Sequence, residues 1–169
     1  MTPLDHLWTG WRHEYVTSVP DADDVDTGGS ACVFCRILAS GLTDDETFVV
    51  HRGSTAFAIL NAYPYSTGHL LVLPFRHVRG LDELTDEESE EVWGITRRAT
   101  EVVGSVYDPE GVNIGFNIGR AAGAGIPGHV HGHVVPRWSG DTNFMTSVAN
   151  TRVLPEALDV TWSKMRQAW

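Results

Sequence analysis

The chain has 169 residues, of which 42% are hydrophobic and 20% are charged, and its formal net charge at pH 7 is −10. These values predict a single globular domain with a full-sized core. The chain contains no apolar run near the roughly 18 residues that cross a bilayer, and its first residues do not resemble a signal peptide. We therefore expect a cytoplasmic protein. The negative charge argues against broad binding to nucleic acid or to an anionic membrane.

The first thirty residues predict an extension that precedes the main domain. Residues 7–19 carry apolar and aromatic side chains at the spacing of a short helix, and residues 20–30 are polar and acidic, as in a mobile loop. We place the main domain at residues 31–145 and a C-terminal tail at residues 146–169, all within one structural domain.

Cys32 and Cys35 are the only cysteines of the chain and have the spacing Cys-x-x-Cys. In an intracellular protein this spacing predicts a metal half-site or a redox motif rather than a structural disulfide. Two thiolates need two further ligands to close a tetrahedral zinc site. A thioredoxin-like role would need an adjacent βαβ pattern, which is missing, and buried free thiols remain an alternative.

The middle of the chain predicts strands on both sides of one long helix. Apolar runs bounded by turn residues predict strands at residues 47–51, 55–60, 69–74, 112–118 and 129–135. The helix is predicted from Thr85 to Tyr107, because a capping box is followed by apolar residues at helical spacing. Strands, one helix and further strands with short connections predict an α+β fold with an antiparallel sheet.

The last predicted strand contains three alternating histidines: His129, His131 and His133. Alternate residues of a strand point to the same face, so the three imidazoles are expected to share one face. The first and last would lie about 13 Å apart along the backbone, whereas a metal–imidazole bond is about 2.0–2.1 Å long. The spacing therefore favours one histidine on a metal and the others facing a substrate.

A Gly/Ala loop at residues 123–128 precedes these histidines and matches the pattern G-x-G-x-x-G. A dinucleotide-binding loop must open a helix, and this loop opens a strand, so the pattern does not predict a Rossmann site. The loop either needs unusual backbone dihedral angles or brings backbone N–H groups close to phosphate. The neighbouring histidines favour phosphate.

Residues 129–135 resemble the signature of the histidine triad (HIT) superfamily, and the resemblance extends over about residues 32–144. It implies a HIT-like fold, with an antiparallel sheet of about five strands, one long helix and short flanking helices. It also implies a nucleotide hydrolase or nucleotidyltransferase that acts on an α-phosphate. Such an enzyme would work through a nucleotidyl-histidine intermediate.

The same resemblance implies a role for particular residues. His131 would be the nucleophile, while His133 and Asn117 would contact the phosphoryl oxygens or the leaving group. Asn61 would bind the ribose hydroxyls and His69 would support the triad. The backbone of Gly125 and Ile126 would stabilise developing charge, and Ile59, with Phe57 and Leu60, would lie near the base.

Zinc-containing relatives in that superfamily complete a Cys-x-x-Cys pair with two histidines. The resemblance therefore implies a structural zinc site made of Cys32, Cys35, His77 and His129. Such a site would hold the N-terminal segment against the triad strand.

Residues 61–69 and 135–145 resemble the diadenosine tetraphosphate (Ap4A) phosphorylase and Ap4A-hydrolase-like branch. Ala124 and Gly125 match neither the Gly-Ser of those phosphorylases nor the Gln of fragile-histidine-type hydrolases, so hydrolysis and phosphorolysis both stay open. We expect cleavage of dinucleoside polyphosphates with Mg²⁺ or Mn²⁺ on the polyphosphate, in a homodimer paired through the long helix and a strand. The alternatives are a nucleoside phosphoramidate hydrolase, another nucleotidyltransferase, or a non-catalytic nucleotide-binding or metal-sensing module.

Overall fold

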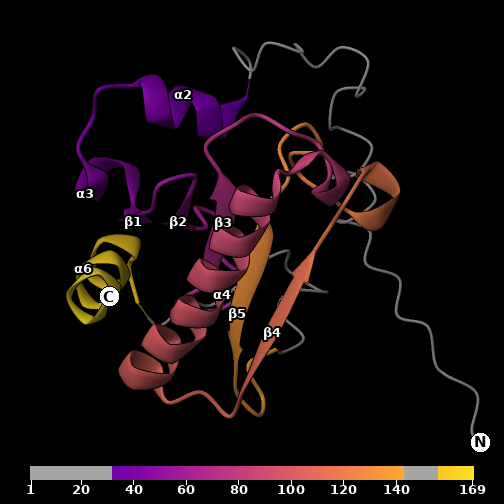
Figure 1. The fold of residues 1–169 in the computed structure, drawn as a ribbon. Coiled ribbons are helices and arrows are strands. Elements are labelled where there is room, and N and C mark those ends of the chain that lie inside the picture. Colours follow the sequence, from indigo (N-terminus) through magenta and orange to yellow (C-terminus); the bar gives the residue numbers. More distant parts are fainter. Residues whose placement is uncertain (1–31, 143–155) are drawn as a thin grey trace, which may run out of the picture.

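A computed structural model of the chain describes residues 32–142 and 156–169. The described part contains a five-stranded antiparallel sheet in the order β1-β2-β3-β5-β4 (Figure 1). The strands are β1 (Val49–Arg52), β2 (Ala56–Leu60), β3 (Leu70–Pro74), β4 (Gly111–Phe116) and β5 (Gly132–Arg137). The predicted α+β fold with an antiparallel sheet is thus confirmed. The predicted helix at residues 7–19 and loop at residues 20–30 lie outside the described residues.

One long helix, α4 (Asp86–Tyr107), packs on one face of the sheet against β2, β3 and β5 (Figure 1). A second helix, α6 (Leu158–Ala168), lies beside it and contacts the edge strand β1. The short elements are α2 (Val33–Ala39), α3 (Asp44–Thr47), η2 (Leu81–Glu83) and η3 (Arg120–Ala122). Within the described residues, no helix combines the length and apolarity needed to cross a bilayer.

The start of α4 is fixed by reciprocal hydrogen bonds. The Thr85 hydroxyl accepts from the Glu88 N–H at 3.2 Å, and the Glu88 carboxylate accepts from the Thr85 N–H at 2.9 Å. Arg76, just after β3, donates to the same carboxylate at 2.7 Å. The helix ends at Asp108, which adopts a left-handed conformation (φ 43°) before Pro109. Local sequence chemistry therefore sets both ends of the helix.

Strands β2 and β3 are buried at every position, because both faces of the sheet are covered there. The face with Ala58, Leu60 and Val72 packs against α4 and α6. The opposite face, with Ile59 and Leu71, packs against the segment that holds Cys32, Phe34 and the rest of α2. The second face is the one that positions the candidate site.

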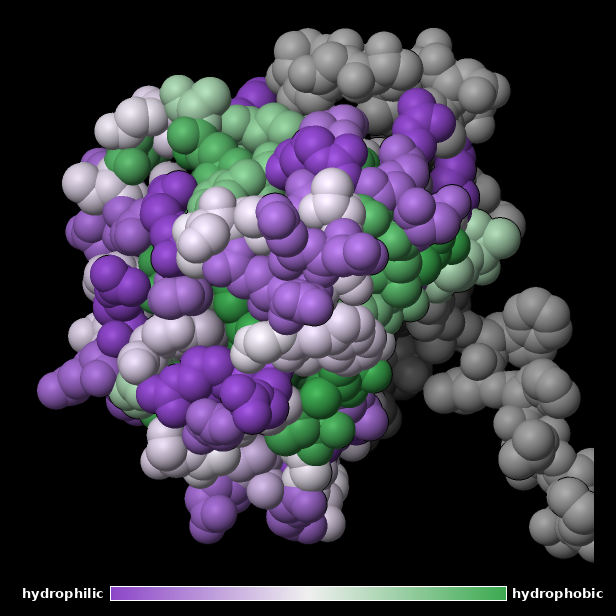
Figure 2. Space-filling model, viewed as in Figure 1, coloured by the Kyte–Doolittle hydropathy of each residue, from purple (hydrophilic) through white to green (hydrophobic). Residues whose placement is uncertain are grey.

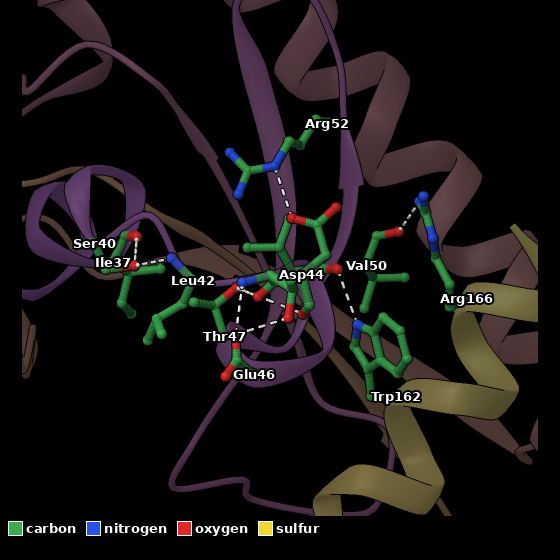
Figure 3. A network of polar contacts seen from close by, with 12 residues as sticks. Ile37, Ser40, Leu42, Asp44, Glu46, Thr47, Val50, Arg52, Trp162 and Arg166 are labelled. Atoms are coloured by element: carbon green, nitrogen blue, oxygen red, sulfur yellow. Dashed lines mark hydrogen bonds and ion pairs between the residues drawn. The ribbon is translucent and has the colours of Figure 1, made fainter.

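Helix α6 is tied to β1 by hydrogen bonds to the strand backbone (Figure 3). The Trp162 indole N–H donates to the Val49 carbonyl at 2.9 Å, and Arg166 donates to the Val50 carbonyl at 2.7 Å. These bonds satisfy carbonyl groups on an edge strand, which would otherwise offer a template for pairing with another chain.

The predicted strand at residues 129–135 is wrong at its start, because β5 begins at Gly132. Gly132 is the first residue of β5, and it pairs with a partner on both sides, Val72 in β3 and Phe116 in β4. The Val130 N–H instead donates to the Val78 carbonyl, outside the sheet, at 2.7 Å. A Cβ on Gly132 would approach the Phe116 ring to 2.8 Å, so a larger residue here would have to displace that ring. Only the third histidine of the triad therefore lies within the strand.

Replacing Thr85 with alanine removes the N-cap of α4 and should lower the free energy of unfolding by about 1 kcal/mol. Urea denaturation followed by circular dichroism measures this change. The matched control is Ser89→Ala, one turn further along the same helix, where no cap is lost and little change is expected. Equal urea midpoints for Thr85→Ala and the wild type would contradict this account of the helix start.

Candidate active site and metal cluster

The three histidines lie on the sheet face opposite α4, where the start of β5 meets the end of β4. His133 is paired with Leu71 on β3, so its side chain shares the face that packs against α2. The ring centroids of His131 and His133 are 5.1 Å apart. Strand β4 ends at Phe116, two residues before the predicted end at Ile118, and Asn117 is the next residue. The structure therefore brings Asn117 to the triad from a loop, not from a strand.

The tautomer of His131 follows from one hydrogen bond. Its Nδ1 lies 2.7 Å from the His129 carbonyl oxygen, which can only accept, so Nδ1 carries the proton. Burial lowers the pKa of His131, and its side chain is only 5% exposed, so the ring is neutral near pH 7. A neutral imidazole has one N–H, and Nε2 of His131 therefore carries a lone pair. This is the state that a histidine nucleophile requires.

A chain of hydrogen bonds fixes the tautomer of His133 in the opposite sense. The Tyr65 backbone N–H donates to His69 Nδ1 at 3.1 Å, so His69 carries its proton on Nε2. That Nε2 lies 3.0 Å from His133 Nδ1, which must accept. The proton of His133 is therefore on Nε2. Burial and then the neighbouring His131 lower the pKa of His133 to about 4, which keeps this ring neutral as well.

Two N–H donors, His133 Nε2–H and the Asn117 amide, thus lie close together, and the His133 ring neighbours that of His131. The Asn117 amide nitrogen lies 3.5 Å from His133 Nε2. Two donors do not bond each other, but both can donate to one phosphoryl oxygen placed between them. The arrangement can hold an anionic phosphoryl group in front of a nucleophilic nitrogen.

The other predicted substrate residues differ in their contacts and in how far they are buried. The Asn61 amide donates to His69 Nδ1 at 3.3 Å and accepts from the Tyr63 N–H at 3.0 Å. Ile59 is only 3% exposed and belongs to the apolar cluster under the triad. Ile126 packs on the same cluster, and Gly125 precedes it in the loop. Their roles toward a substrate stay predictions.

Cys32, Cys35, His77 and His129 form a cluster in which all four ligand atoms lie within 4.8 Å of one another. His129 Nδ1 lies 3.5 and 3.7 Å from the two sulfurs, and His77 Nδ1 lies 3.4 Å from Cys35 Sγ. In a tetrahedral zinc site the edge between sulfur and nitrogen is about 3.6 Å. The cluster therefore has the dimensions of a site that could hold a metal ion.

The protonation of this cluster suits a cation. His129 Nε2 lies 3.0 Å from the Pro74 carbonyl oxygen, so Nε2 carries the proton and the Nδ1 lone pair faces the sulfurs. Burial lowers the pKa of His129 to about 4. Burial and the neighbouring Cys32 raise the pKa of Cys35 to about 11, a cost of charging the thiol that a bound cation would offset.

The HIT domain family model matches residues 43–140 of the chain. The chain belongs to the HIT family. It is 41% identical over 167 residues to the AP-4-A phosphorylase of Mycobacterium tuberculosis, a match that covers 98% of this chain and 85% of that protein. It is 36% identical over 93 residues to the asymmetrical bis(5′-nucleosyl)-tetraphosphatase of Schizosaccharomyces pombe, covering 55% of this chain and 50% of that protein.

The predicted HIT-like fold is confirmed by solved HIT structures. A zinc-bound histidine triad family protein from Mycobacterium smegmatis superposes with a TM-score of 0.67 at 27% identity. The match covers 83% of this chain and 94% of that one.

Two side chains of this HIT site were not predicted from the sequence. Phe34, between the two cysteines, places its ring 5.6 Å from that of His129 and 5.4 Å from that of His131. The Tyr65 ring stacks on His133 at 5.8 Å with an interplanar angle of 10°. An aromatic residue inside the Cys-x-x-Cys motif was the available signal for Phe34, whereas no local pattern marks Tyr65.

Replacing His69 with leucine removes the donor to His133 Nδ1 and should leave His133 as a mixture of both neutral tautomers. Nitrogen-15 NMR of the imidazole groups distinguishes the two protonation sites. The matched variant is His69→Gln, whose amide offers both an acceptor and a donor and should keep the proton of His133 on Nε2. If His69→Leu leaves the nitrogen shifts of His133 unchanged, the hydrogen-bonded chain does not set its tautomer.

Proposed function

We propose that this HIT protein is an enzyme that cleaves dinucleoside polyphosphates such as Ap4A at an α-phosphate. The observation that carries the proposal is the lone pair on His131 Nε2, fixed by the His129 carbonyl, with the paired donors of His133 and Asn117 on the neighbouring ring. The names of the mycobacterial and yeast relatives, a phosphorylase and a tetraphosphatase, support this substrate class.

The reaction would proceed in two displacements. His131 Nε2 would attack the α-phosphorus, forming a P–N bond as the bond from phosphorus to the bridging oxygen breaks. His133 Nε2–H and the Asn117 amide would donate to the phosphoryl oxygens or to the departing oxygen as its negative charge develops. An acceptor would then attack the same phosphorus and release His131.

The acceptor in the second step would be orthophosphate or water. The phosphorylase relative matches nearly the whole chain, and this favours orthophosphate. Gly125 offers no side chain to select between the two acceptors, so the backbone of the loop at residues 123–128 would contact either one. We expect Mg²⁺ or Mn²⁺ to accompany the polyphosphate as part of the substrate.

We propose that the metal held by Cys32, Cys35, His77 and His129 is zinc. The two sulfur and two nitrogen donors, the tetrahedral edge lengths and the zinc-bound relative support this choice. Zinc would act as a structural cross-link there, joining the segment at Cys32 to His129. The triad would therefore rely on the metal for its position and not for chemistry.

We further propose that the protein is a homodimer that pairs through α4 and β4. The outer edge of β4 has no partner strand among the described residues, and β4 is largely exposed. Trp93 on α4, Ile114 on β4 and Ile118 just after it are each about half exposed. Figure 2 shows a largely hydrophilic face that carries hydrophobic patches, one of them over the region of β4.

The cytoplasmic location and the division of the chain at residues 30 and 145 stay predictions.

His131→Ala should reduce turnover of Ap4A by roughly 10⁴-fold or more, because no other group can take the role of the nucleophile. Intact-protein mass spectrometry after an alkaline quench should show one nucleotidyl group on the wild type and none on the variant. His51→Gln, on the edge strand β1, is the control and should behave as the wild type. Retained turnover in His131→Ala would overturn the mechanism.

Assays with different substrates separate the proposal from its alternatives. Ap4A with and without orthophosphate distinguishes phosphorolysis from hydrolysis, and adenosine 5′-phosphoramidate tests for a phosphoramidate hydrolase. A non-catalytic module would bind AMP without forming an adduct.

Metal analysis of protein purified under reducing conditions without chelator should find one zinc ion per chain. Cys32→Ser should lose most of that zinc and unfold at a lower temperature, because the metal no longer joins the two segments. Cys32 is buried beside His129, so the control is the wild type stripped with chelator and reloaded with zinc, which should recover its melting temperature. Wild-type protein without stoichiometric zinc would contradict the assignment.

A further inference from the structure

An open cavity of about 250 Å³ lies between the segment after β3 and the loop after β4. No role has been given so far to the charged side chains that line it. Its walls include Arg79, Asp82, Ile118, Gly119, Arg120 and Pro127. Gly119 has a φ of +79°, and no atom lies within 4 Å of the position that its Cβ would occupy. The loop therefore turns without placing a side chain at this point of the wall.

Two of the segments that line the cavity are attached to the triad. Ile118 follows Asn117, whose amide lies 3.5 Å from His133 Nε2. Arg79 follows Val78, whose carbonyl accepts from the N–H of Val130, the residue before His131. Three residues of extended chain span at most about 10 Å, so the Cα atom of Arg120 lies within that distance of the Cα atom of Asn117. The two arginines that line the cavity therefore lie on segments whose neighbouring residues contact the triad.

The charges in the cavity suit a phosphate chain that carries a divalent cation. Arg79 and Arg120 bring two guanidinium groups, which bind phosphate oxygens through paired N–H donors. Asp82 and Glu83 line the same cavity, so it is close to neutral overall. Glu83 also accepts from the Arg79 backbone N–H at 3.1 Å, which ties the two residues together. A magnesium-complexed polyphosphate presents both signs of charge and therefore matches this lining.

We propose that Arg79 and Arg120 bind the phosphates of the leaving group, beyond the phosphorus that His131 attacks. This inference rests on the proposed function. The two arginines would select substrates with a long phosphate chain over those with a single phosphate. They are specificity residues and take no part in forming or breaking the bond at phosphorus.

The test uses Arg79→Gln, Arg120→Gln and the double variant in the full-length protein. Loss of each guanidinium should lower kcat/KM for magnesium-Ap4A about tenfold, and the double variant about a hundredfold. Adenosine 5′-phosphoramidate has the same adenosine α-phosphate and no chain beyond it, so its kcat/KM should change less than twofold. Arg97→Gln, an exposed arginine on α4, removes the same charge elsewhere and should change neither substrate.

Binding of magnesium tripolyphosphate, measured by calorimetry, separates this inference from the proposed function. The wild type should bind it, and the double variant should bind at least tenfold more weakly. If the wild type does not cleave Ap4A, the proposed function fails, while the calorimetry still decides the role of the cavity. Equal binding by the wild type and the double variant, or equal loss of activity on both substrates, would overturn the inference.

Discussion

The hydrogen bond from His131 Nδ1 to the carbonyl oxygen of His129 is the interaction on which the site depends. It places the proton of His131 on Nδ1 and leaves the lone pair on Nε2. The residue that provides the carbonyl is itself held at three points. Its Nε2 donates to Pro74, its Nδ1 faces the two sulfurs, and its ring packs against Phe34. The candidate metal cluster and the proposed nucleophile therefore both depend on one residue.

The first two histidines of the triad precede β5, and this affects the hydrogen bond between them. Had β5 started at His129, the carbonyl of that residue would have been available to a neighbouring strand. Because β5 starts at Gly132, the carbonyl of His129 is free to accept from His131. His133, within the strand, has a fixed position relative to Leu71 and takes its tautomer from His69. The same segment thus holds His131 and His133, the proposed nucleophile and proton donor, in opposite tautomers.

The sequence predicted those features that depend on local chemistry. The capping box at Thr85 and Glu88 located the start of α4, and apolar runs located β2 and β3 to within one residue. The start of β5 was misplaced because alternation along the chain says nothing about where partners from β3 and β4 end. His77 could be joined to the cysteine pair only by family resemblance, since 42 residues separate it from Cys35. The contacts of Phe34 and Tyr65 depend on packing between distant segments, which no local pattern encodes.

The most direct test of this account is the protonation state of His131 in the protein near pH 7. Nitrogen-15 NMR of the imidazole groups, with the His131 signals assigned by their loss in His131→Ala, reports which nitrogen carries hydrogen. The account predicts a neutral ring with a protonated Nδ1 and an unprotonated Nε2. A ring protonated on Nε2, either as the other neutral tautomer or as imidazolium, would contradict it.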